Sequence, residues 1–162
     1  MRLDPKKLAV NYYFGDLQHW KLPKIAADAL AQGFDGPALR KLASLSNLSS
    51  HDLRAEDIGT IETDAAFREM GVNAPITKDE ARLALAIESA HKVLNGGWNV
   101  FNEAAYVRIH LCELSNSPDA LSRIVILSRE ALHAPRSEWG RVEADLKDAF
   151  SDFLMRQNSA KS

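Results

Sequence analysis

The sequence predicts an all-α protein. Hydrophobic residues recur along most of the chain at the three- and four-residue spacing of an amphipathic helix, and the period-two alternation of a β-strand is almost absent. Proline and capping residues stand where these periodic segments begin, and glycine or polar residues stand where they end. These observations predict a compact bundle of about eight short-to-medium helices joined by short loops, with the C-terminal four the longest.

The first three helices are predicted from their starts. Asp4 and Pro5 precede a helical pattern over residues 6–13, and proline is favoured at the first helical position. Pro23 opens a second helix, which ends at residue 31 or 32. Pro37 opens a third, and the polar residues 47–50 follow it as a break.

The fourth predicted helix begins at Asp52 or Ala55 and runs to Met70, where Gly71 stops it. Gly59 weakens the early part of this helix, because glycine loses more backbone freedom in a helix than other residues do.

The strongest local signal lies at residues 77–80. Thr77 and Glu80 form the capping-box pattern, in which each side chain binds a backbone N–H of the other residue. This pattern predicts a helix over residues 78–95. Asn99 is predicted to cap the next helix, which runs to about Leu114.

The last two helices are also predicted from local signals. Ser117 and Pro118 predict the start of one helix, which Pro135 ends, and Ser137 is predicted to cap the final helix. Residues 157–162 are expected to form a frayed tail.

A six-residue pattern occurs twice, as Leu-Ala-Gln-Gly-Phe-Asp at residues 30–35 and Leu-Asn-Gly-Gly-Trp-Asn at residues 94–99. A glycine in the left-handed conformation often ends a helix, and the next residue often packs on the last turn. We therefore expect positive φ at Gly33 and at Gly97 or Gly96, burial of Phe34 and Trp98, and capping of the following helices by Asp35 and Asn99.

Length and composition indicate one soluble globular domain over residues 1–162, with an internal division near residues 71–76 as the alternative. The net charge of −2 and the pI near 6.2 argue against nucleic acid as a partner. The single cysteine, Cys112, excludes an intrachain disulfide and favours a reducing compartment. The N-terminus lacks the apolar segment of a signal peptide, and the apolar runs are too short for a bilayer, so we expect a cytoplasmic protein that does not contact the membrane.

The candidate metal ligands are two Glu-x-x-His pairs, Glu88 with His91 and Glu130 with His133. Residues three apart share a helix face, and two such pairs with one carboxylate from each of two other helices form the ligand set of di-iron bundles. Glu62 and either Glu113 or Glu103 are the candidates for the lone carboxylates. The opposing interpretation is that His91 is semi-buried and that His133 interacts with the C-terminus of its helix. We favour this interpretation, and the sequence indicates no catalytic residue or cofactor.

Two further features favour a binding surface for a protein. Aromatic residues are dense near the N-terminus, and tyrosine and tryptophan are frequent interface hot spots. Residues 52–64 contain five acids and one arginine, which would attract a basic partner. The alternatives are an N-terminal segment that anchors to its own domain, or forms a homodimer interface, and an acidic face that is merely solvated. The candidate partner-binding residues are Tyr12, Tyr13, Trp20, Asp52, Glu56, Asp57, Glu62 and Asp64.

The stretch from Ala26 to Ala43 contains a helix ending in Gly33, then Asp35, Pro37 and the run Leu-Arg-Lys-Leu-Ala. It resembles the opening of small all-helical uncharacterised bacterial proteins, which also tend to have a later helix that ends in glycine before Asx, similar to residues 90–99 here. The resemblance covers about a quarter of the chain and includes no catalytic residue. Some such proteins look like immunity or accessory proteins of bacterial toxin systems. The resemblance therefore implies a toxin-neutralising protein that covers the active site of a basic toxin domain.

Overall fold

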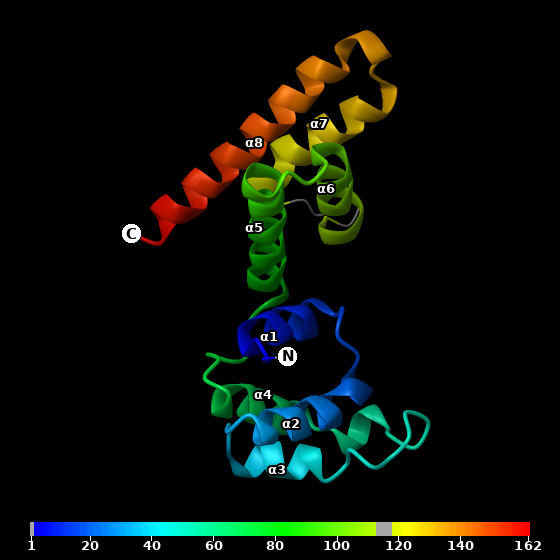
Figure 1. The fold of residues 1–162 in the computed structure, drawn as a ribbon, viewed down its shortest axis with the longest axis vertical. Helices are drawn as coiled ribbons and strands as arrows, with labels where there is room; N and C mark the ends of the chain where they lie inside the picture. The colour runs from blue at the N-terminus through cyan, green and yellow to red at the C-terminus, as the bar shows by residue number, and fades with distance from the viewer. Residues whose placement is uncertain (1, 113–117) are drawn as a thin grey trace. The chain divides into compact units, whose positions relative to one another are not determined.

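The computed structural model describes residues 2–112 and 118–162, and in this part of the chain it has eight α-helices and no strand (Figure 1). The all-α prediction is therefore confirmed. The chain divides into two compact units, residues 1–82 and 83–162. The boundary lies within a helix, and the loop at residues 71–76 belongs to the first unit.

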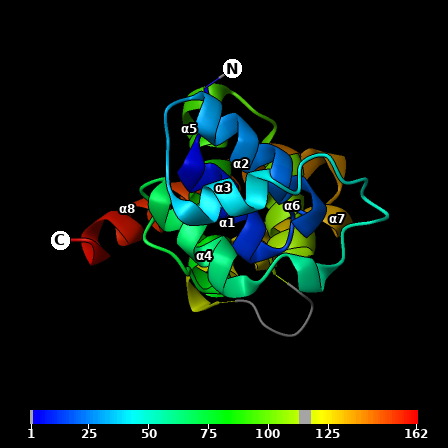
Figure 2. The same cartoon turned by 90° about the horizontal axis from the view of Figure 1, so that it is seen from below.

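Unit 1 contains α1 (Pro5–Phe14), α2 (Leu22–Ala31), α3 (Pro37–Ala43), α4 (Thr60–Glu69) and the first turn of α5 (Lys78–Gly96). Short 3₁₀ turns precede α2, at His19–Lys21, and α4, at Ala55–Asp57. The helix α3 packs against both α2 and α4, and the perpendicular view also shows α2 beside α3 (Figure 2). The core of the unit is built from small and large apolar residues of these helices, among them Leu22, Ala29, Leu39, Leu42 and Phe67.

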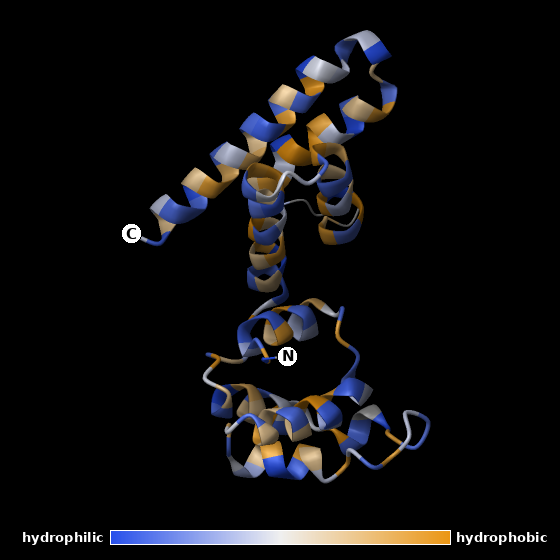
Figure 3. Ribbon diagram, in the orientation of Figure 1, coloured by the Kyte–Doolittle hydropathy of each residue, from blue (hydrophilic) through white to orange (hydrophobic). Residues whose placement is uncertain are grey.

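Unit 2 contains the rest of α5, α6 (Val100–Tyr106), α7 (Ser122–His133) and α8 (Trp139–Ala160). A π-helical segment, Val107–Leu111, continues α6, so that the helical run spans Val100–Leu111. Two 3₁₀ turns, Asp119–Leu121 and Arg136–Glu138, precede α7 and α8. Hydrophobic and hydrophilic residues alternate around α8 (Figure 3), and its apolar stripe is buried. The stripe consists of Val142, Leu146, Ala149, Phe150 and Phe153.

Two predicted caps are confirmed, and Asp4, which was predicted only as part of a helix start, is a third cap. Asp4 Oδ1 accepts from the Lys7 N–H at 3.1 Å. Thr77 N donates to Glu80 Oε2 at 2.7 Å, and Glu80 N donates to Thr77 Oγ at 3.1 Å, which completes the capping box. Asn99 Oδ1 accepts from Asn102 N at 3.1 Å. Each of these caps joins residues three apart, so each could be predicted from local sequence.

The start of α4 was predicted wrongly. The segment from Ala55 to Asp57 forms only a 3₁₀ turn, and α4 begins at Thr60 after Gly59, whose backbone is extended. Gly59 therefore separates the two segments instead of merely weakening one helix.

Two features near the C-terminus also differ from expectation. Ser137 does not cap the last helix, because it lies inside the 3₁₀ turn Arg136–Glu138, and α8 begins after Glu138 without a side-chain cap. The helix α8 then continues to Ala160, through most of the segment 157–162. The predicted helix start at Ser117 lies outside the described residues.

The repeated six-residue pattern forms two different joints. Gly33 and Gly97 both have positive φ, at 93° and 65°, as predicted. Phe34 packs against the core of unit 1, and its N–H donates to Ala29 O at 3.1 Å. Trp98 is 56% exposed, so its predicted burial is wrong. Its N–H donates to Lys92 O, one residue farther back, and its ring lies 5.0 Å from Lys92 Nζ in a cation–π contact.

Asp35 does not cap α3, contrary to the prediction. Its carboxylate instead accepts from Arg40 Nε at 2.8 Å and Nη2 at 2.6 Å, and this interaction lowers the pKa of Asp35. The first N–H groups of α3 donate to Glu69 of α4, with Ala38 N at 3.0 Å and Leu39 N at 2.8 Å. The start of α3 is therefore fixed by a residue about thirty positions away in the sequence.

Candidate partner-binding surfaces

The structure brings together two of the predicted partner-binding residues, but inside unit 1. The Tyr13 hydroxyl donates a hydrogen bond to Asp64 Oδ1. Burial and this hydrogen bond raise the pKa of Tyr13. The rings of Tyr12 and Tyr13 each pack 5.7 Å from the Phe67 ring, measured between centroids. Tyr12, Tyr13 and Asp64 thus join α1 to α4.

The remaining predicted acids are exposed to different degrees and have different partners. Glu62 forms an ion pair with Lys41 at 2.6 Å, and the hydrogen bond from Lys41 lowers the pKa of Glu62. Asp57 accepts from Arg54 N at 2.9 Å and caps a 3₁₀ turn. Asp52 accepts from Ser49 Oγ. Glu56 is exposed and has no polar partner among the described residues.

Trp20, the third predicted aromatic anchor, lies at the surface of unit 1. It is 40% exposed and lines a groove of about 510 Å³, and Lys21 Nζ lies 5.2 Å from its ring centroid. Leu48 on the opposite loop is 46% exposed and lines the same groove. The other lining residues are Lys21, Lys24, Ile25, Asp28, Ser46 and Ser50.

The groove and the acidic stretch share one loop. Ser50 lines the groove, and Asp52, Glu56 and Asp57, which are exposed, follow within seven residues. Leu48 was not among the residues predicted from the sequence. A large apolar residue within the polar break at residues 47–50 was the signal that could have identified it.

The candidate metal ligands of unit 2, which we did not favour as a metal site, do not form a metal-binding cluster among the described residues. Among the residues that the structure describes, no group of three or more His, Cys, Asp or Glu side chains could hold a metal ion. Glu88 pairs with Lys92 at 3.4 Å, His91 lies 3.2 Å from the Asn95 amide, and Glu130 binds Arg141 at 2.6 Å. The proposed lone carboxylate Glu103 is buried in α6, whereas Glu113 lies outside the described residues.

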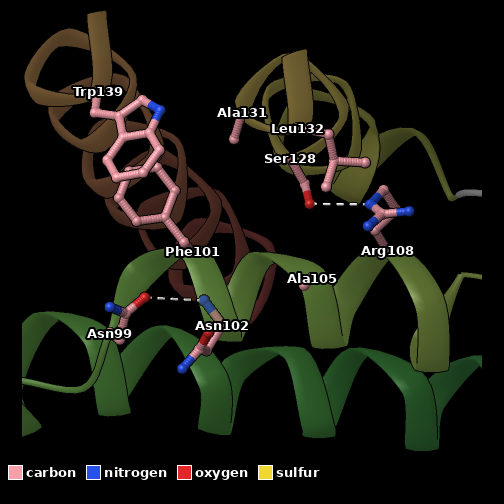
Figure 4. Close-up of a pocket in the computed structure, with 9 residues that line it drawn as sticks. All are labelled: Asn99, Phe101, Asn102, Ala105, Arg108, Ser128, Ala131, Leu132 and Trp139. Atoms are coloured by element: carbon pink, nitrogen blue, oxygen red, sulfur yellow. Dashed lines mark hydrogen bonds between the residues drawn. The ribbon is translucent and has the colours of Figure 1, made fainter. Parts of the chain in front are cut away.

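A second cavity, which the sequence did not predict, lies in unit 2 (Figure 4). It has a volume of about 280 Å³ and lies between α6 with its π-helical continuation, α7 and the first residue of α8. At one end, the rings of Phe101 and Trp139 lie 6.5 Å apart between centroids. Ala105, Ala131 and Leu132 complete the apolar walls.

The other end of this cavity is polar. Arg108 comes from the π-helical segment, and its Nε donates to Ser128 Oγ of α7 at 3.1 Å (Figure 4). Ser128 is buried, and none of the lining residues that the structure describes is a carboxylate. Two features of the sequence can be related to this cavity once the structure is known. They are the aromatic residues at the starts of two helices and an arginine between apolar residues of one helix.

No protein-family model matches the chain, and no curated protein or solved structure showed a significant similarity to it. Over the described residues, none of the helices combines the length and the apolar character that a membrane crossing needs.

Proposed function

We propose that this protein is a binding module for another protein, and that it engages a basic partner through the groove of unit 1. The observation that carries the proposal is the pairing of Trp20 and Leu48, two partly exposed apolar side chains, across one groove. A tryptophan in a depression at the surface provides a large contact area at low conformational cost, which is why such residues are frequent hot spots.

The acidic charge on the loop beside the groove gives the class of partner, whereas the charged residues of the groove itself are Lys21, Lys24 and Asp28. Asp52, Glu56 and Asp57 lie on the exposed loop that also lines the groove, and Arg54 is the only lysine or arginine among residues 42–64. Negative charge at the rim of an interface speeds association with a basic partner and sets its orientation. Glu62 and Asp64 are excluded from this set, because Lys41 and Tyr13 already bind them.

The specific form of the proposal is a toxin-neutralising, immunity-type protein that acts by occlusion. A module with an apolar anchor and an acidic loop beside it is suited to cover the basic substrate-binding face of a toxin domain without chemistry of its own. Tyr12 and Tyr13 support this surface indirectly, since they pack α1 against Phe67 of α4.

The proposal is tested by affinity capture from a lysate of the source organism, with the wild-type chain and the Trp20→Ala/Leu48→Ser variant as baits. We expect a basic protein that the wild type enriches and the variant loses. Replacing Trp98 by alanine in unit 2 provides a matched control, because it removes an exposed tryptophan that lines neither the groove nor the cavity of unit 2. Equal recovery with the Trp20 variant would contradict the proposal.

A charge test follows once the partner is purified. Glu56→Lys removes an acid without breaking a hydrogen bond among the described residues. We expect slower association and a smaller dependence on salt concentration, because exposed charges act mainly on the association rate. Asp119→Lys in unit 2 is the control. For the immunity-type function, the protein must also inhibit the toxic activity of the partner at an equimolar ratio.

A further inference from the structure

The cavity of unit 2 combines one cation with apolar walls, which defines the class of ligand it can bind. We infer that this cavity is a binding site for a small monocarboxylate with an aromatic or branched apolar body. The inference is independent of the groove proposed above, which lies in the other unit.

Arg108 is the residue that would recognise the carboxylate. Guanidinium carries five N–H donors, and only the Nε–H is used among the described residues, in the hydrogen bond to Ser128 Oγ. The two terminal nitrogens therefore keep donors that match the two oxygens of a carboxylate. Ser128 is 4% exposed, so it holds the Arg108 side chain from a buried and fixed position.

The backbone at Arg108 adds a second observation. The segment Val107–Leu111 is π-helical, and Cys112 N donates to Val107 O at 2.9 Å, five residues back. Such turns are rare and occur frequently at functional sites, because they change which side chains a helix presents. Here the turn buries Val107 and Leu111 while Arg108 lines the cavity.

The apolar end restricts the ligand further. Phe101, Trp139 and Leu132 offer ring faces and a branched side chain, and Leu132 is 64% exposed even though it lines a cavity. An apolar body placed there would cover part of this surface, which favours binding. The volume of about 280 Å³ is at the small end of ligand pockets, so it suits one ring with a short chain.

The charge of the cavity lining favours a ligand with a single negative charge. Among the described residues that line the cavity, Arg108 is the only charged one. A phosphate monoester carries a charge of about −1.5 to −2 near pH 7, and one guanidinium would leave part of it uncompensated in an apolar site. A monocarboxylate matches the charge of the site.

The test is a titration of the isotope-labelled full chain with 3-phenylpropionate, followed by NMR of the backbone amides and of the Trp139 indole N–H. We expect shifts at the cavity residues that saturate with a Kd on the order of 1 mM, as a small ligand of this size permits. The neutral amide, 3-phenylpropanamide, should bind about tenfold more weakly or worse, because it cannot form the charge-assisted pair. This comparison uses the unmodified chain and does not depend on any variant folding.

Two variants locate the site. Arg108→Gln should raise the Kd for 3-phenylpropionate by about tenfold. Arg129→Gln removes an exposed arginine of α7 outside the cavity and should leave this Kd unchanged. Ala131→Leu should block binding by filling the cavity. The inference is overturned if 3-phenylpropionate causes no saturable shift up to about 10 mM, if the amide binds equally well, or if the Arg108 and Arg129 variants behave alike.

Discussion

The hydrogen bond between Tyr13 and Asp64 shows how a single residue can link two helices of unit 1. The Tyr13 ring packs on Phe67 while its hydroxyl donates to the carboxylate of Asp64. Tyr12, its neighbour, makes the ring contact with Phe67 but no hydrogen bond through its hydroxyl among the described residues. A comparison of the two tyrosines therefore separates the contribution of ring packing to stability from that of the hydrogen bond.

Tyr13→Phe should lower the free energy of unfolding by about 1 to 2 kcal/mol, because Asp64 loses a donor while the ring packing remains. Tyr12→Phe should change it by less than about 0.5 kcal/mol. Chemical denaturation of the two variants measures both values. If both substitutions have the same effect, the hydrogen bond does not contribute to stability.

We also expect Tyr13 to make the stability of the fold depend on pH in the alkaline range. The pKa of Tyr13 is raised above its ordinary value of 10.0 by burial and by Asp64. The protonated form is thus favoured in the folded state, and its contribution to stability is complete below about pH 10 and is lost as pH rises through the folded pKa. Between about pH 9 and pH 11, the wild type should lose more stability than Tyr13→Phe, measured by denaturation at each pH.

Ser89 in α5 presents the opposite case, a buried hydroxyl that has no hydrogen-bond partner in the described part of the chain. Its side chain is 1% exposed. Ser89→Ala should raise the free energy of unfolding by up to about 1 kcal/mol, because alanine removes an unsatisfied group and has a higher helix propensity. Ser128→Ala provides the contrast and should destabilise, since Ser128 Oγ accepts from Arg108. Thermal melts of both variants give the comparison.

At the scale of the elements, the distance along the chain between the bonded groups decides what the sequence could predict. The caps by Asp4, Thr77 and Asn99 were predictable, because each bonds a backbone group three residues away. The cap of α3 was not predictable, because Glu69 reaches it from the end of another helix. From the local sequence, Asp35 was predicted to cap α3, but its carboxylate binds Arg40.

Glu69→Ala should destabilise unit 1 by about 1 to 2 kcal/mol, because the N–H groups of Ala38 and Leu39 lose their acceptor. Hydrogen exchange at these two amides should accelerate. Asp35→Ala is the matched control and should have a smaller effect, since its ion pair with Arg40 is exposed. A larger effect of Asp35→Ala would contradict this assignment of the cap.

Gly36 makes the approach of Glu69 possible. A Cβ atom at this position would lie 2.1 Å from Glu69 Cδ, so any other residue would displace the carboxylate. The sequence showed Gly36 beside Pro37 and indicated a turn, but the need for glycine comes from a side chain that arrives from α4.

The candidate sites were less predictable than the helices for the same reason. Trp20 was identified from its residue type, whereas Leu48 joins it only because the loop after α3 folds back over α2. Arg108 and Ser128 lie twenty positions apart and belong to different helices, so neither suggested a site in the sequence. Trp98 was assigned to the core from a cap pattern, yet it lies over Lys92 at the surface.

At the scale of the whole molecule, the division into two units falls between Arg82 and Leu83, inside α5. A continuous helix with a regular apolar pattern contains no linker signal, so composition alone could not place this boundary. Each unit has its own large buried side chains, with Phe67 in unit 1 and Phe150 in unit 2, both fully enclosed.

Separate cores predict separate stabilities. Phe67→Ala removes a large buried ring from unit 1 and should cost about 3 to 5 kcal/mol there, and Phe150→Ala should do the same in unit 2. Because cooperative units open by themselves, Phe67→Ala should accelerate hydrogen exchange in α2, α3 and α4 while the amides of α7 and α8 keep their protection. Phe150→Ala should give the reverse pattern. Mass spectrometry of peptides after exchange distinguishes these patterns, and equal loss of protection throughout the described helices in both variants would show that the chain unfolds as one cooperative unit.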